Sequence, residues 1–120
     1  MQGRRADRVS TLIQEEISRL ILQSVKDPKI GFVAVTRVSV TDDLRQARVY
    51  IASITGEEKQ RQESLIGLKR AAGFLRGELG RRLTLRYVPE ILFSLDDSLE
   101  QELHMDKLFR QIEATGTKEQ

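Results

Sequence analysis

Cysteine is absent from this 120-residue sequence, and histidine occurs once. Without cysteine the chain forms no disulfide, no thiolate metal site and no cysteine nucleophile. The single histidine, His104, has no second histidine or cysteine with which to bind a metal ion, and a Ser-His nucleophile pair is not indicated. Neither the phosphate-binding loop of nucleotide hydrolases nor the dinucleotide fingerprint occurs. We therefore expect a protein that is not an enzyme and that uses no metal or cofactor.

Long hydrophobic runs are also missing. No apolar segment approaches the roughly 20 residues that span a bilayer, and no apolar core of a signal peptide follows the basic N-terminus. The content of 39% hydrophobic and 32% charged residues is typical of a soluble folded domain. We expect a cytoplasmic monomer with no membrane partner and no small-molecule substrate. Its single domain covers residues 1–114, and the polar tail 115–120 is expected to be disordered.

Hydrophobic periodicity divides the chain into helices and strands. It predicts an amphipathic helix over residues 4–25, strands over 32–40 and 46–54, a third strand over 84–95 and a last helix over 99–112. Pro89 lies inside the third strand and favours an edge position or a bulge there. Between the first two strands, Asp42 and Asp43 are interpreted as turn residues that bond their own backbone rather than as metal ligands.

The stretch 65–93 is the centre of the predicted organisation. Leu65, Leu68 and Ala72 form one helical face, and Leu75, Leu79 and Leu83 form another beyond Ala71-Ala72-Gly73. A glycine inside a straight helix costs about 1 kcal/mol relative to alanine. We therefore predict an interhelical kink at Ala71, Ala72 and Gly73, and we interpret Gly77 and Gly80 as close-packing positions in the second helix.

The order of elements predicts the fold class. It is helix, strand, strand, helix, bend, helix, strand, helix. A helical crossover between the second and third strands makes these two parallel. Helices packed on one face of a three-stranded mixed sheet give an α+β fold.

Charge is distributed unevenly along the chain. Residues 59–86 hold eight basic and two acidic residues, a net charge of +6, whereas residues 90–120 carry −5. A basic block on one structural unit is typical of a phosphate-binding surface, although a solvated helix surface explains it as well. Arg4, Arg5 and Arg8 stand at the start of the first helix, where the helix dipole disfavours cations. An external anion would explain that placement, and frayed, solvated side chains are the alternative.

Several motifs, taken in order, resemble the ribosome-binding factor A family. They are Arg4-Arg-Ala-Asp-Arg-Val9, Val38-Ser-Val-Thr-Asp-Asp-Leu44, Ala47-Arg-Val-Tyr50, Gly73-Phe-Leu-Arg-Gly-Glu-Leu79, Arg86-Tyr-Val-Pro-Glu90 and Asp96-Asp-Ser98. The resemblance implies a type II K-homology fold, α-β-β-α-kink-α-β plus a C-terminal helix, in which the Ala-x-Gly kink replaces the G-x-x-G loop. The literal match Gly77-Glu78-Leu79-Gly80 is not that loop, because an acid and a core leucine occupy its middle.

The resemblance also implies a function and a set of contacts. The partners would be 16S rRNA and the 30S ribosomal subunit, and the role would lie in late 16S rRNA maturation, including 5′-end processing, and in cold adaptation. The residues expected to face RNA are Lys69, Arg70, Arg76, Arg81, Arg82 and Arg86, followed by Arg4, Arg5, Arg8, Arg45 and Arg48. Tyr50 and Tyr87 either stack on a base or pack on the sheet. Two other functions stay open: a basic adaptor that docks an acidic protein, and a general RNA-binding protein.

Overall fold

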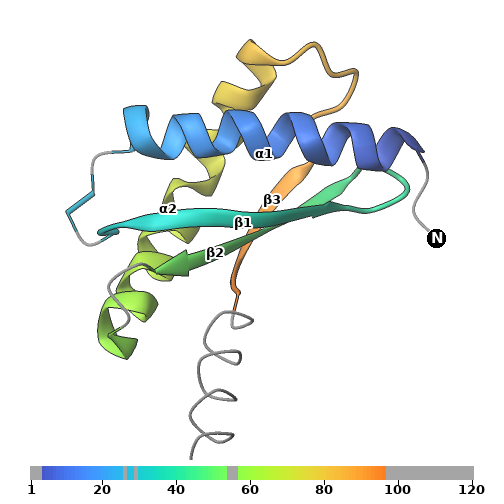
Figure 1. Cartoon of the computed structure of the whole chain (residues 1–120). Helices are drawn as coiled ribbons and strands as arrows, with labels where there is room; N and C mark the ends of the chain where they lie inside the picture. The colour runs from blue at the N-terminus through green and yellow to red at the C-terminus, as the bar shows by residue number, and fades with distance from the viewer. Residues whose placement is uncertain (1–3, 26, 29, 54–56, 97–120) are drawn as a thin grey trace, which may run out of the picture.

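The computed structural model describes residues 4–25, 27, 28, 30–53 and 57–96 (Figure 1). Its elements are α1 (Arg4–Ser24), β1 (Val33–Val40), β2 (Gln46–Ser53), α2 (Glu58–Arg82) and β3 (Glu90–Leu95). They follow the predicted order as far as the third strand, except that one helix stands where two were predicted. The predicted last helix, His104 and the tail 115–120 lie outside the described residues. None of the described helices is long and apolar enough to cross a membrane.

The three strands form one mixed sheet in the order β1-β2-β3. β1 pairs with β2 antiparallel, and β2 pairs with β3 parallel. The parallel pairing and the edge position of the third strand are thus confirmed. Its predicted start at residue 84 is wrong, because residues 84–89 form a loop and the strand begins after Pro89. Proline has no N–H group to donate to the neighbouring strand. The backbone pairing of β3 with β2 therefore begins at the Glu90 amide, which donates to the carbonyl of Arg45 at 2.8 Å.

β1 contains an irregularity that changes which side chains face the helices. Its register against β2 shifts between Val35 and Arg37. Val33 and Val35 pack against the core before the shift, and Val38 and Val40 are buried after it. The extra residue of a bulge reverses the alternation of a strand, so valines at both ends of β1 face the core.

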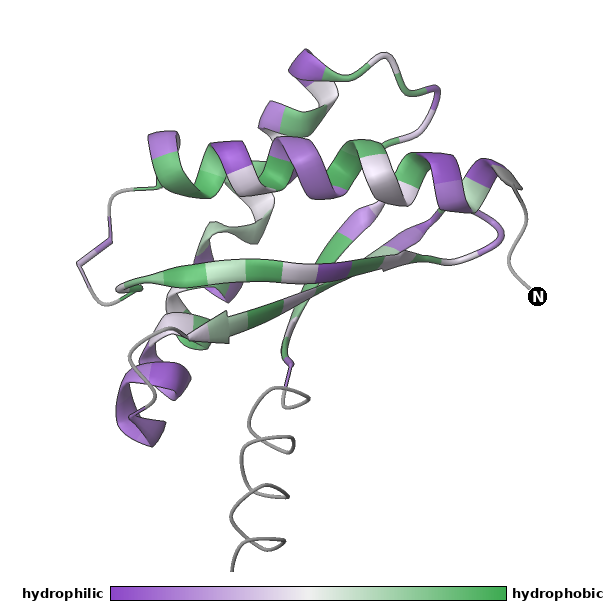
Figure 2. Cartoon of the chain, in the orientation of Figure 1, coloured by the Kyte–Doolittle hydropathy of each residue, from purple (hydrophilic) through white to green (hydrophobic). Residues whose placement is uncertain are grey.

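Both helices cover the same face of the sheet. Fully buried side chains come from α1, α2 and the sheet and form one core: Ile13, Ile17, Leu20, Val40, Val49, Ile51, Leu68, Leu75 and Leu79. Alternate residues of β2, such as Arg48, point to the opposite, open face. Hydrophobic and hydrophilic bands accordingly alternate along α1 in Figure 2. The α+β prediction is confirmed.

A single 25-residue helix replaces the two predicted around Gly73. The predicted interruption into two helices at Ala71, Ala72 and Gly73 is therefore wrong, whereas a bend of the helix axis there stays a prediction. Leu68, Leu75 and Leu79 lie on one continuous buried face, with Ala71 and Ala72 half-buried between them. Burying such a side chain contributes about 1.5–3 kcal/mol, so packing on both sides of Gly73 outweighs the local cost of about 1 kcal/mol for the glycine.

The three glycines in the second half of α2 have different surroundings. A Cβ atom built at Gly73 or Gly77 would meet no other described atom within 4 Å, so the close packing predicted for Gly77 is wrong. At Gly80 the prediction is confirmed, because a Cβ there would lie 3.2 Å from Cγ2 of Val88. Gly80 therefore lets the chain return closely past the end of α2.

Candidate nucleic-acid interface

The cations that the sequence suggested on the second half of α2 contact other parts of the protein. Arg81 pairs with Glu78 at 2.7 Å, and Arg82 lies 3.4 Å from Glu16 of α1 and 3.7 Å from Glu78. Arg76 donates from Nε and Nη2 to the carbonyl of Val88, at 3.2 and 2.9 Å. The guanidinium groups of these three arginines therefore make contacts within the folded protein.

A second set of cations is exposed and has no ion pair or side-chain hydrogen bond with any described residue. It includes Arg5 and Arg8 of α1, Lys69 and Arg70 of α2, and Arg86 in the following loop. Exposed, unpaired guanidinium and ammonium groups keep all their N–H donors for an external anion. We call these five residues the free cations.

The remaining predicted cations differ in position. The side chain of Arg4 is not among those described. Arg45 is exposed in the turn between β1 and β2, and Arg48 donates to the hydroxyl of Ser94 at 2.9 Å on the open face of the sheet. Also on this face, the guanidinium of Arg37 lies 4.0 Å from the centre of the Tyr50 ring, so Tyr50 packs on the sheet. Arg37 was missed by sequence reasoning, and only the hairpin register, which pairs it with Tyr50, would have indicated this contact.

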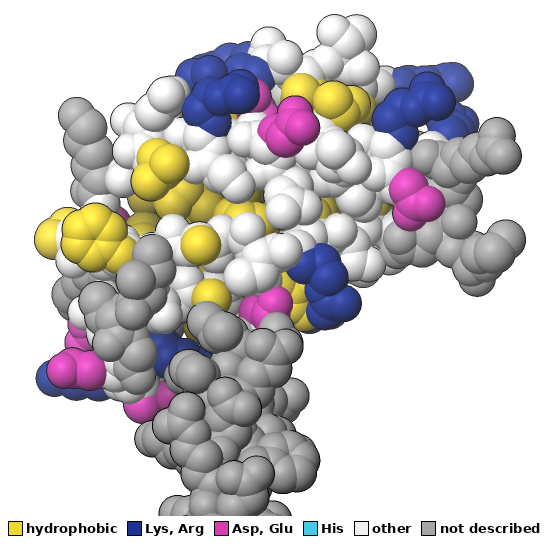
Figure 3. Space-filling view, viewed as in Figure 1, with side chains coloured by type: hydrophobic (Ala, Val, Ile, Leu, Met, Phe, Trp, Pro, Cys, Tyr) yellow, Lys and Arg dark blue, Asp and Glu magenta, His cyan; other side chains and the backbone are white. Residues whose placement is uncertain are grey.

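Three elements meet around a cavity of about 610 Å³ at one end of the molecule, which we call the basic groove. The N-terminal part of α1, the β1–β2 turn and the loop after α2 lie close together there (Figure 1). In Figure 3 dark-blue Lys and Arg side chains gather at the upper right of the molecule, over this end. The residues that line the groove are Arg5, Arg8, Val9, Asp43, Leu44, Thr84, Leu85, Arg86 and Tyr87. Three of the five free cations therefore share one cavity.

The loop that carries Arg86 and Tyr87 is fixed at both ends. At its start the Leu83 amide donates to the Leu79 carbonyl at 2.8 Å, which caps α2. At its end Arg76 holds the Val88 carbonyl, and Pro89 is fully buried. The middle of the loop stays open to solvent, since Tyr87 is 52% exposed. The loop therefore presents Arg86 and Tyr87 from a fixed backbone.

The β1–β2 turn is ordered by Asp43. Its Oδ1 atom accepts from the Thr41 hydroxyl at 2.6 Å and from the Arg45 amide at 3.1 Å. The Thr41 hydroxyl, followed by the Arg45 amide, holds the pKa of Asp43 below its ordinary value. The predicted turn role is thus confirmed for Asp43, and no group of metal-binding side chains occurs within the described part of the chain.

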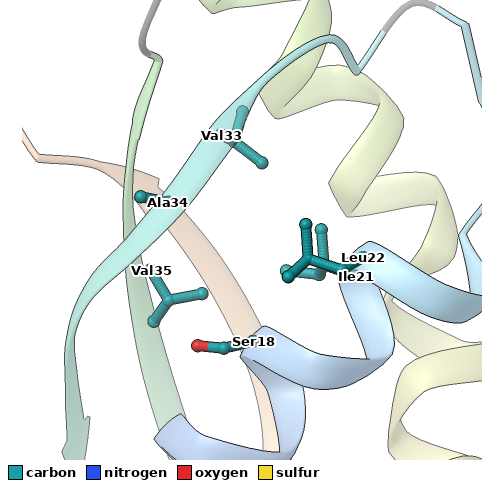
Figure 4. Close-up of a pocket in the computed structure, with 6 residues that line it drawn as sticks. All are labelled: Ser18, Ile21, Leu22, Val33, Ala34 and Val35. Atoms are coloured by element: carbon teal, nitrogen blue, oxygen red, sulfur yellow. The ribbon is translucent and has the colours of Figure 1, made fainter.

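A smaller hollow of about 210 Å³ lies between the C-terminal half of α1 and β1 (Figure 4). Six residues line it: Ser18, Ile21, Leu22, Val33, Ala34 and Val35. None of these six is charged, so this hollow offers no cation to a phosphate group. The basic groove and the free cations of α2 are the surfaces suited to nucleic acid.

The chain is similar to known proteins of one family. The sequence model of the family described as ribosome-binding factor A matches residues 5–109. Ribosome-binding factor A of Desulfitobacterium hafniense is 45% identical over 120 residues, which is 100% of this chain and 95% of the relative. That of Acetivibrio thermocellus is 47% identical over 111 residues, covering 92% of this chain and 89% of the relative.

Solved structures show the same fold. The crystal structure of ribosome-binding factor A from Thermus thermophilus has a TM-score of 0.66 at 24% identity and covers 75% of this chain and 93% of its own. A homology model of the Thermus thermophilus protein, fitted into a cryo-electron microscopy map of its complex with the 30S subunit, has a TM-score of 0.61 at 25% identity and covers 73% and 91%. The family match spans most of the chain and the relatives match nearly their whole length, so this chain belongs to the ribosome-binding factor A family.

Proposed function

We propose that this protein is a non-catalytic assembly factor that binds 16S rRNA on free or immature 30S subunits in the cytoplasm. It assists late maturation of that RNA, including processing of the 5′ end, and acts in adaptation to cold. Membership of the family supports this function, as does the 30S complex described for the Thermus thermophilus relative. The observation that carries the proposal is the set of five exposed cations without a described partner.

Binding would rest on charge and shape. Lys69 and Arg70 are exposed on α2, and by helical spacing they share a face with Gly73 and Gly77, whose missing side chains leave open space. A phosphate backbone can approach such a bare helix surface closely while the two cations contact its oxygens. Contacts to phosphate position a protein but carry little sequence information. Specificity for the subunit would therefore come chiefly from the folded shape of the RNA.

Co-sedimentation tests the partner. The purified full-length chain is expected to sediment with free 30S subunits, and ribonuclease treatment should abolish the association. A complex that survives ribonuclease would identify a protein partner instead. Equal competition by unrelated RNA would identify a general RNA-binding protein, because such a protein does not distinguish the folded subunit.

Cells test the role. A strain that lacks the protein is expected to accumulate precursor 16S rRNA in the 30S fractions of a sucrose gradient, more strongly at low growth temperature. Complementation with a variant in which Lys69, Arg70 and Arg86 are replaced by alanine should fail, whereas Arg81→Ala should restore most of the mature RNA because Arg81 already pairs with Glu78. Normal 16S rRNA processing in the deletion strain would contradict the proposed role.

A further inference from the structure

The basic groove has the size and charge of a site for one nucleotide. Its volume of about 610 Å³ lies within the roughly 300–1,000 Å³ of small-molecule pockets. Arg5 and Arg8 enter from α1 and Arg86 enters from the loop after α2. These three cations against the single carboxylate of Asp43 leave a net charge suited to the phosphates on either side of a nucleoside.

Tyr87 gives the groove an aromatic surface. It lines the cavity beside Arg86, and the residue is 52% exposed. Aromatic rings that are held in place and open to solvent bind unpaired bases by stacking. Because Arg76, Gly80 and Pro89 fix the loop around it, the ring needs no large rearrangement before a base binds.

Asp43 supplies the group that can distinguish one base from another. It lines the same cavity as Arg5, Arg8 and Arg86, but forms no ion pair with them. The hydrogen bonds from Thr41 and Arg45 both go to its Oδ1 atom. An ionised carboxyl group accepts about four hydrogen bonds in all, so acceptor positions remain for a ligand.

Hydrogen-bond chemistry selects guanine for this carboxylate. Guanine presents two adjacent donors, N1–H and N2–H, on its Watson–Crick edge. Adenine and cytosine each place a ring acceptor beside one amino donor, and uracil places its single donor between two carbonyls. A carboxylate acceptor is therefore satisfied best by guanine.

We propose that the basic groove binds a single unpaired guanine nucleotide of the RNA. The base stacks on Tyr87, its donor edge meets Asp43, and the flanking phosphates lie at Arg5, Arg8 and Arg86. This site deepens the proposed function and rests on it, because it supplies a local base-specific contact within an otherwise shape-directed interaction with RNA.

Fluorescence anisotropy with labelled pentanucleotides tests the site on the full chain. We expect UUGUU to bind more tightly than UUAUU by on the order of tenfold. Tyr87→Ala should weaken both RNAs and reduce the preference. Asp43→Asn should abolish the preference for guanine, because it removes the carboxylate. The Oδ1 atom of the asparagine can still accept from Thr41 and Arg45, so the turn is kept. As a matched control, Arg70→Ala lies outside the groove and should leave the ratio of the two affinities unchanged.

Equal affinity of the wild-type chain for the two pentanucleotides would overturn the site, and so would an unchanged preference in Asp43→Asn. Thermal unfolding of each variant excludes misfolding as the cause of a loss. Co-sedimentation with 30S subunits separates this result from the proposed function. If the chain binds 30S subunits but shows no preference for guanine, only the proposed nucleotide site is wrong. If it prefers guanine but does not bind 30S subunits, the proposed function is wrong and the nucleotide site stands.

Discussion

Glu16 of α1 contacts Arg82, the last residue of α2, with 3.4 Å between Oε1 and Nη1. The other oxygen of Glu16 lies 2.7 Å from Arg19, and the Glu16 side chain is only 10% exposed. A carboxylate buried to this degree costs free energy unless it is paired. Arg82 therefore ties the end of one helix to the middle of the other, and its role in RNA binding stays a prediction.

Replacing Arg82 by alanine should consequently lower the stability of the fold. Because Arg82 itself is 40% exposed, solvent screens the pair, and we expect a loss of only about 0.5–1.5 kcal/mol in urea-induced unfolding. Arg81→Ala is the matched control. Arg81 is 79% exposed in its pair with Glu78, so its loss should change stability by less than about 0.5 kcal/mol. Equal effects of the two substitutions would show that the link to Glu16 is unimportant.

Replacement of glycine by alanine is expected to have opposite effects on stability at two positions of α2. A Cβ atom at Gly67 would lie 2.7 Å from Cγ1 of Ile30 and 3.1 Å from a carboxylate oxygen of Asp27. Gly67→Ala should therefore destabilise the protein by about 1–3 kcal/mol through overpacking. At Gly73 the added methyl group meets open space, and Gly73→Ala should stabilise the helix by about 0.5–1 kcal/mol. Chemical denaturation of both variants measures the difference, and a destabilised Gly73→Ala would restore the idea of a kink.

The outcome at Gly73 shows where sequence reasoning succeeded and failed. α1 was predicted to within one residue because its apolar rhythm runs along the helix and Pro28 follows it. The predicted interruption of the helix was wrong because a local glycine cost was weighed without the packing across it. Yet Leu68, Ala72, Leu75 and Leu79 keep one helical spacing, and this continuity was available in the sequence. The odd spacing from Val35 to Val38 likewise indicated the irregularity in β1.

The candidate site was predictable only in part. The basic residues were visible in the sequence, but which of them are free depends on acids brought close by folding. Glu78 stands three residues before Arg81 and four before Arg82, so these pairs follow from helix geometry. Glu16 is 66 residues from Arg82, and no spacing rule connects them. The basic groove also joins three distant segments, which only the tertiary structure brings together.

Arg76 is expected to act as a positioning residue for the loop 83–89. Its guanidinium holds the Val88 carbonyl with two hydrogen bonds. Arg76→Ala should speed amide hydrogen exchange over residues 84–88 by roughly fivefold, since the loss of about 1 kcal/mol permits more frequent local opening. Arg76→Lys keeps a donor and should recover part of the protection. Unchanged exchange in Arg76→Ala would show that Pro89 and Gly80 suffice to fix the loop.

Acid is expected to lower the stability of the protein slightly through Asp43 in the β1–β2 turn. Asp43 has a pKa below its ordinary value of 3.8, chiefly because it accepts from the Thr41 hydroxyl. A carboxyl group with a lowered pKa favours the folded state above its ordinary pKa, and that contribution disappears as the pH falls through the folded value. Thr41→Val should raise the pKa of Asp43 toward 3.8, which a carbon-detected NMR titration measures directly. The same titration would find no change if the Arg45 amide alone held the carboxylate.

The free cations of α2 predict how binding depends on salt. Each phosphate contact that is lost should reduce the slope of log affinity against log salt by roughly 0.7–0.9, because fewer counterions are released. Replacing Lys69 and Arg70 by alanine should therefore weaken binding to 30S subunits and flatten the slope, whereas Arg81→Ala should change both less. Titrations at several salt concentrations measure the slopes. A double variant that binds more weakly with an unchanged slope would mean that these side chains do not contact phosphate, and it would move the interface away from this face of α2.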